Sequence, residues 1–155
     1  MAEIEERTVI AAPVDAVFDY RLDFGANLMA CNPSVRAVVQ THGDGPGVGS
    51  TYRVRVRLAP AFTTDATLTV TDAVRPSRVA DLAESFLSAQ EVVSFEPRLL
   101  PDGRMGTEVC FVVRTSPEGR GWRLLDAVVL PPLTRRQVRT ELRRMRHDLE
   151  SRAPR

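Results

Sequence analysis

The sequence predicts an α+β domain in which one curved antiparallel sheet of about seven strands is covered by a long C-terminal helix. Two observations carry this prediction. Between residues 34 and 115, stretches of alternating apolar and polar residues are separated by turns rich in glycine and proline. Beyond residue 119, apolar residues recur at helical spacing. The chain has 155 residues, no internal repeat and no low-complexity linker, so we expect a single domain over residues 1–155.

The chain begins with a predicted strand followed by two short helices. Residues 3–10 combine alternation with β-branched side chains, which indicates a strand. Pro13 suits the first turn of a helix, and apolar residues recur at helical spacing after it. Residues 24–31 form the second predicted helix, which ends before Pro33 because a residue that precedes proline avoids the helical conformation.

The clearest strand in the sequence is the stretch YRVRVRL at residues 52–58, where apolar side chains alternate with arginines. One face of this strand is therefore predicted to be buried and the other to be solvated. Folding the strand about Ala61 onto residues 64–70 places Val54 opposite Leu68. A slip by one residue would place arginines against apolar side chains, so the pattern favours this register.

Two acidic residues are predicted to face each other in the next hairpin. We expect residues 80–86 to continue the inward face through Glu84, and a tight turn at Leu87 and Ser88 then places Glu91 opposite Glu84. Directly opposed carboxylates raise the pKa of one of them, as in general acid–base pairs. Glu84 and Glu91 are therefore candidate catalytic residues, together with Tyr52, whose phenol lies on the inward face. The alternatives are a solvated rim for both glutamates and a core position for Tyr52.

Two helical segments are predicted near the C-terminus. Apolar side chains share one face of residues 122–129 and again one face of residues 138–149. Pro131 and Pro132 separate the segments, so we expect one helix kinked at this point or two helices in series. The second segment, from Pro132 to about Arg152, is about 31 Å long at 1.5 Å per residue, enough to cross a whole sheet. A curved sheet rarely closes perfectly against one helix, and a cavity between the two is expected.

Six short motifs, in this order, span nearly the whole chain. They are IAAPVDAVF at residues 10–18, NPSV at 32–35, GVGSTY at 47–52, FEP at 95–97, GTEV at 106–109, and DLE at 148–150, where an arginine-rich helix ends. Together they resemble the START-related, birch-pollen-allergen-like superfamily, and specifically its bacterial branch of polyketide cyclase/dehydrase and lipid-transport proteins. The resemblance implies the helix-grip fold, in which the sheet wraps around the C-terminal helix. Relatives often carry an aromatic residue where this chain has Asn32.

The resemblance and the apolar inward faces favour binding of a small hydrophobic or amphipathic ligand, such as a lipid, an isoprenoid or a polyketide. The residues predicted to line the cavity are Phe24, Leu28, Tyr52, Val54, Val56, Leu68, Phe95, Phe111, Leu125 and Val129. Phe24 and Leu28 are expected at its entrance. A second hypothesis is a cofactor-independent polyketide aromatase/cyclase or dehydratase. A third is a module that binds a partner through the basic C-terminal helix.

The formal net charge of +1 divides into two opposite parts. Residues 119–155 hold ten basic and four acidic residues, whereas acidic residues predominate in the rest of the chain. Arg135, Arg139 and Arg143 recur every four residues, which predicts a basic stripe on the last helix. The stripe could meet an acidic partner or a membrane surface. No aromatic residues interleave with it, so a nucleic-acid partner is not expected.

Neither a metal nor a cofactor is expected. His42 and His147 have no cysteine or carboxylate at ligand spacing. The glycine cluster at residues 43–49 leads into a strand, whereas phosphate-binding loops lead into a helix. The N-terminus lacks the pattern of a secretory signal and no apolar run reaches about 18 residues, so we expect a cytoplasmic protein without a membrane span. The sequence leaves the oligomeric state open.

Overall fold

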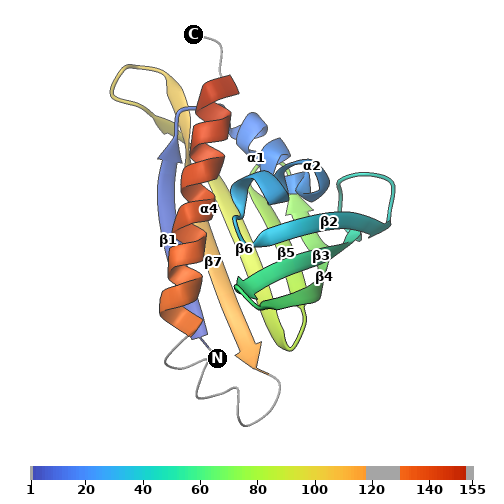
Figure 1. The fold of residues 1–155 in the computed structure, drawn as a ribbon. Helices are drawn as coiled ribbons and strands as arrows, with labels where there is room; N and C mark the ends of the chain where they lie inside the picture. The colour runs from blue at the N-terminus through green and yellow to red at the C-terminus, as the bar shows by residue number, and fades with distance from the viewer. Residues whose placement is uncertain (1, 118–129, 153–155) are drawn as a thin grey trace.

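The computed structural model describes residues 2–117 and 130–152 (Figure 1). In these residues the elements follow the predicted order of a strand, two short helices, six strands and a long helix. Their bounds are β1 (Ala2–Ile10), α1 (Val14–Leu22), α2 (Phe24–Cys31), β2 (Val35–His42), β3 (Thr51–Ala59), β4 (Phe62–Val74), β5 (Arg78–Glu84), β6 (Leu87–Leu99), β7 (Met105–Pro117) and α4 (Leu130–Arg152). The predicted α+β class is confirmed.

Within the described chain, seven strands form one antiparallel sheet in the order β1-β7-β6-β5-β4-β3-β2. Figure 1 shows α4 running lengthwise over β1 and β7, with α1 and α2 beside it. Two hydrogen bonds fix the C-terminal end of α4. Tyr20 Oη donates to Asp148 Oδ2 over 2.7 Å, and the amide of Ala11 donates to Glu150 Oε1 over 3.0 Å. The predicted helix-grip architecture is confirmed.

The register predicted between β3 and β4 is wrong by two residues. Val54 lies opposite Ala66, and Leu68 lies opposite Tyr52. Ala59 pairs with Phe62, so the turn is centred between Pro60 and Ala61. A bulge lies between Arg57 and Ala59 of β3. A shift by two residues keeps each side chain on its predicted face, because the side-chain period of a strand is two.

The inward face predicted for β5 is also wrong. Val79 and Asp81 are fully buried, whereas Glu84 is exposed on the opposite face. The hairpin turns at Ser85 rather than at Leu87, and an irregularity in β4 shifts the alternation of its neighbour β5. The observed phase is tolerated because the buried carboxyl of Asp81 is paired with Arg21, while Glu84 stays in solvent.

The C-terminal helix α4 begins at Leu130, so that Pro131 and Pro132 lie in its first turn, where a missing amide hydrogen is tolerated. The predicted apolar face is confirmed, because its residues at helical spacing are buried: Val138, Leu142, Met145 and Leu149. The helical segment predicted before the prolines lies outside the described residues. Among the described helices, none is both long enough and apolar enough to cross a membrane.

The core occupies one end of the space between the sheet and α4. There α1, α2 and the C-terminal half of α4 cover the sheet, and the large side chains of Phe18, Phe24, Phe95 and Met145 are buried. Phe18 meets Phe95 edge to face at 6.1 Å between ring centroids. Burying such a side chain contributes about 1.5–3 kcal/mol. The N-terminal half of α4 covers the other end, where the packing is incomplete.

Candidate functional site

A cavity of about 440 Å³ lies between the N-terminal half of α4 and the inward faces of β3 to β7. This volume falls in the range of small-molecule sites, about 300–1,000 Å³. Small side chains of three strands leave the space open, namely Ala66, Ala83 and Ala89. The other lining residues are Pro33, Ser34, Val56, Leu58, Thr64, Ser85, Phe86, Leu87, Glu91, Val113, Thr115, Leu133, Thr134, Arg136, Gln137, Val138, Thr140 and Glu141.

One residue predicted to line the cavity, Val56, does so. Seven others are buried in the core and lie outside the cavity lining: Phe24, Leu28, Tyr52, Val54, Leu68, Phe95 and Phe111. Leu125 and Val129 lie outside the described residues. The difference has a physical cause, because α1 and α2 fill this end of the sheet. Phe24 and Leu28 belong to α2, and the other five side chains project from the strands beneath the helices. The sequence signal for the true position of the cavity is the inward-facing alanines of β4, β5 and β6, because small side chains leave space between the sheet and α4.

Tyr52 occupies a core position at the end of the sheet away from the cavity. Its side chain is 1% exposed and packs against the ring of Phe24 at 5.9 Å between centroids. A Cβ atom on Gly25 would lie 3.7 Å from the Tyr52 ring, so the helix α2 passes closely over it. Burial raises the pKa of the Tyr52 phenol. This arrangement corresponds to the core alternative for Tyr52.

A buried ionic cluster separates the core from the cavity. Arg21 Nη1 donates to Glu141 Oε1 over 2.7 Å, and Arg21 Nη2 donates to Asp81 Oδ1 over 3.0 Å and to Glu91 Oε2 over 2.8 Å. We call these four residues the Arg21 cluster. Arg21, Asp81 and Glu141 are at most 4% exposed. The guanidinium also lies 4.8 Å from the centroids of two rings, those of Phe24 and Phe111.

Four different elements contribute the Arg21 cluster, namely α1, β5, β6 and α4. Asp81 lies directly opposite Glu91 in the pairing of β5 with β6, whereas Glu84 lies opposite Ser88. The predicted opposition of Glu84 and Glu91 is therefore wrong, although Glu91 does face a carboxylate across this hairpin. Glu84 is exposed on the outer face of the sheet and does not line the cavity under α4.

Two members of the cluster left a signal in the sequence. Arg21 follows Val14, Val17 and Phe18 at helical spacing, which places it on the buried face of α1. Glu141 lies between Val138 and Leu142 on the apolar face of α4. A charged residue on an apolar helix face is expected to have a buried partner of opposite charge.

The most deeply buried carboxyls of the cluster resist ionisation. Burial raises the pKa of Glu141 to about 7, although Arg21 acts in the opposite direction. Burial and the neighbouring Glu91 raise the pKa of Asp81 well above its usual value, against the same influence of Arg21. The cluster therefore holds protons that exposed carboxyls would lose at neutral pH.

The cluster presents two carboxyls to the cavity. Glu91 and Glu141 belong to the cavity lining, whereas Arg21 and Asp81 lie behind them. Glu141 also faces two donors on the α2 side: Asn32 Nδ2 at 3.4 Å and Cys31 Sγ at 3.8 Å. Chemically, this end of the cavity can accept hydrogen bonds and exchange protons, while the remaining wall is mostly apolar.

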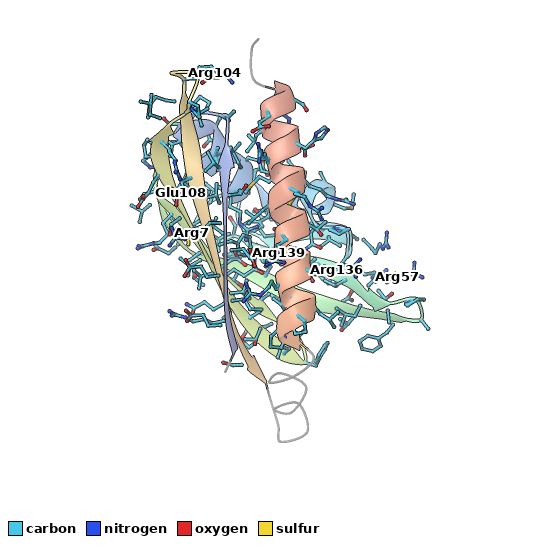
Figure 2. The ribbon with its side chains drawn as sticks, turned by 90° about the vertical axis from the view of Figure 1, so that its left-hand side faces the viewer. Arg7, Arg57, Arg104, Glu108, Arg136 and Arg139 are labelled. Atoms are coloured by element: carbon cyan, nitrogen blue, oxygen red, sulfur yellow. The ribbon has the colours of Figure 1, made fainter. Side chains whose placement is uncertain are left out.

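The predicted basic stripe on α4 is partly neutralised by β1. Arg135 Nη1 and Arg139 Nε both donate to Glu6 Oε1, over 2.7 and 3.0 Å. Arg143 Nη2 lies 3.3 Å from Thr140 Oγ1. Figure 2 shows Arg139 and its neighbour Arg136 on α4. An acidic partner or a membrane surface at this stripe stays a prediction.

A second hollow, of about 540 Å³, lies between β1 and the arginines of α4. It is larger than the cavity under α4, but its wall is mainly charged and Glu6 already occupies part of it through two ion pairs. The cavity under α4 has a mostly apolar wall that also carries several polar side chains, as small-molecule sites do, so that cavity is the candidate site. In the described part of the chain, no three His, Cys, Asp or Glu side chains are placed to hold a metal ion.

A comparison with protein-family models matches residues 1–150 to the family described as polyketide cyclase/dehydrase and lipid transport. A comparison with curated proteins finds no match. TTHA0849 from Thermus thermophilus has a similar structure, with a TM-score of 0.76 and 17% identity over 99% of this chain and 100% of that chain.

Two further solved structures are similar over almost their whole length. DR_A0006 from Deinococcus radiodurans matches with a TM-score of 0.66 and 19% identity, over 97% of this chain and 98% of that chain. Ara h 8.0201 matches with a TM-score of 0.64 and 13% identity, over 97% and 98% of the two chains. At these identities, the structural likeness establishes the fold.

Proposed function

Since the chain belongs to the polyketide cyclase/dehydrase and lipid transport family, we propose that it binds a small hydrophobic or amphipathic ligand in the cavity between the sheet and α4. A lipid, an isoprenoid or a polyketide has the required character. The observation that carries the proposal is the cavity itself, an opening of about 440 Å³ with a mostly apolar wall and one polar end.

The test is to fill the cavity from within. Ala89 lies on the inward face of β6 and lines the cavity, so Ala89→Phe would occupy part of the space that a ligand needs. Binding is measured as the fluorescence rise of N-phenyl-1-naphthylamine, an uncharged apolar probe. We expect saturable binding to the unaltered protein and a loss of affinity of about tenfold or more in Ala89→Phe.

The neighbouring residue provides a matched control. Gln90 is exposed on the outer face of the same strand, so Gln90→Phe adds the same ring without entering the cavity. Its affinity for the probe should equal that of the unaltered protein. Equal affinities in all three proteins, with folding verified by circular dichroism, would place probe binding elsewhere and contradict the proposal.

A cofactor-independent cyclase or dehydratase is the second candidate, and one observation favours it. Glu91 and Glu141 line the cavity and belong to a cluster that holds protons near neutral pH. A protonated carboxyl can donate to a substrate oxygen while a neighbouring carboxylate takes a proton from carbon, which is general acid–base catalysis. Such an enzyme would lose turnover of a polyketide-like substrate in Glu91→Gln and keep it in Glu84→Gln.

A further inference from the structure

The Arg21 cluster contains two buried polar atoms without a hydrogen-bond partner among the described residues, Arg21 Nε and Asp81 Oδ2. Both terminal nitrogens of Arg21 are already divided among three carboxyls. Asp81 Oδ2 is fully buried and accepts no hydrogen bond from the described residues. A buried polar atom without a hydrogen-bond partner is destabilising. The hydrogen bonds within the cluster are therefore incomplete.

The cluster also carries an excess of negative charge. One guanidinium faces three carboxyls, so two negative charges are uncompensated when all three are ionised. The side chains around the cluster include the thiol of Cys31 and the amide of Asn32, and neither brings a positive charge. In the empty protein, protons retained by Asp81 and Glu141 compensate part of this excess.

Glu91 is the member of the cluster that a ligand can reach. Its side chain is 23% exposed and lines the cavity, whereas the side chain of Asp81 is fully buried. The hydrogen bond that Arg21 donates to Glu91 ends on Oε2. A ligand in the cavity would therefore meet the cluster at the carboxyl of Glu91.

We propose that the Arg21 cluster binds the ammonium end of an amphipathic amine at Glu91, while the apolar part of the amine fills the cavity. The inference rests on the proposed function and adds to it the chemical class of the ligand. An ammonium group supplies both a hydrogen-bond donor and a positive charge. A hydroxyl group supplies a donor without the charge, and a carboxylate would add a fourth anion.

The remaining charge on the cavity wall agrees with this orientation. Among the described lining residues, the other charged side chain is Arg136, which is exposed near the start of α4. The interior end of the cavity is therefore acidic and its exposed end is basic. A cationic group is favoured at the inner end, next to Glu91.

Binding of a cation should expel protons from the cluster. An ammonium group beside Glu91 stabilises the ionised carboxylates, so the protons held by Asp81 and Glu141 near neutral pH are released to the buffer. Calorimetric titration in two buffers with different enthalpies of ionisation measures this release directly. We expect net proton release on binding of decylamine at pH 7 and none on binding of decan-1-ol.

The test compares three probes that share one apolar chain: decylamine, decan-1-ol and decanoate. Each is titrated at pH 7 as a competitor of N-phenyl-1-naphthylamine. Decylamine should bind about tenfold more tightly than either of the others, as expected for a hydrogen bond to a charged group. Glu91→Gln should remove this preference, so that decylamine and decan-1-ol bind to the variant with affinities within about threefold of each other. Glu84→Gln, on the outer face of the same hairpin, is the matched control and should retain the preference.

Three outcomes would overturn the inference while leaving the proposed function intact. They are binding of decanoate as tight as that of decylamine, an unchanged preference in Glu91→Gln, and no proton release with decylamine. The last measurement uses the unaltered protein, so it decides the question even where Glu91→Gln fails to fold. Failure of all three decyl compounds and of the naphthylamine probe to bind would instead contradict the proposed function itself.

Discussion

At the scale of single residues, Arg21 holds the three carboxyls that close the inner end of the cavity. Its exposed fraction is 4%, and it reaches strands β5 and β6 and helix α4 through three ion pairs. Removing one member of a buried ionic cluster costs more than a surface pair is worth, because it leaves an uncompensated charge in a low dielectric. The geometry of the cavity wall therefore depends on a few charged side chains rather than on packing alone.

The pH dependence of stability follows from Glu141. Its pKa is raised from 4.5 to about 7 in the folded protein, so between these values the folded state binds more protons than the unfolded state. The free energy of unfolding therefore falls as pH rises from 4.5 through 7. In Glu141→Gln this decrease should be smaller by on the order of 1–3 kcal/mol, measured by urea denaturation at pH 5 and pH 7.

A surface glutamate gives the comparison for this experiment. Glu96→Gln, at an exposed position on β6, should leave the difference between pH 5 and pH 7 as it is in the unaltered protein. Because Asp81 also retains a proton, some pH dependence should persist in Glu141→Gln. A pH dependence of the same size in Glu141→Gln and in the unaltered protein would show that Glu141 holds no proton in this window.

At the scale of secondary structure, the position of α1 decides where Arg21 lies. The chain enters α1 directly from β1, whose last residue, Ile10, pairs with Thr107 of β7. Thr107 Oγ1 donates to the carbonyl of Ala12 over 2.8 Å at a buried position. This junction at the edge of the sheet therefore fixes the start of the helix that carries Arg21.

Gly106 is required at this junction because two backbones approach closely. A Cβ atom at Gly106 would lie 2.7 Å from the carbonyl oxygen of Ile10, closer than side-chain carbons come to backbone. Gly106→Ala should lower the free energy of unfolding by about 1–3 kcal/mol, measured by chemical denaturation. Gly25 lies in α2, where an added Cβ atom would be at an ordinary 3.7 Å from the ring of Tyr52. Gly25→Ala should therefore be neutral or stabilising by about 0.5–1 kcal/mol. Equal effects of the two substitutions would contradict the close approach.

The sequence predicts elements better than it predicts their registers. Apolar residues recur every two positions in the strands and every three or four positions in α4, which distinguishes the two. Turns rich in glycine or proline separate the strands. Register is less well determined, because a shift by two residues preserves every face, as the pairing of Val54 with Ala66 shows. The phase of β5 depended on a turn at Ser85 and on an irregularity in β4, neither of which alternation alone reveals.

The candidate site was harder to predict than the fold, for a related reason. Large aromatic residues such as Phe95 and Phe111 were natural candidates for a cavity wall, but large side chains fill space and pack in the core. The wall is formed instead by small residues, including Ala83 and Ala89. The ionic cluster needed the three-dimensional arrangement, because Arg21 meets Glu141 across 120 positions of sequence.

At the scale of the whole molecule, one space between the sheet and α4 is divided into a filled end and an open end. The C-terminal half of α4 covers the core, and its N-terminal half covers the cavity. The Arg21 cluster lies where the two meet, so that Glu91 and Glu141 form part of the cavity wall. The fold thus places an apolar space next to a charged group that can select a ligand.

Methyl-detected NMR during titration with decan-1-ol tests the central claim, binding inside this cavity, most directly. The account predicts saturable shifts of the methyl groups that line the cavity, in Val56, Ala66, Ala83, Ala89, Val113 and Val138, with little change in the core methyls of Val79 and Val109. Unchanged methyl signals, or shifts confined to Thr8 and Leu142 in the hollow between β1 and α4, would contradict it.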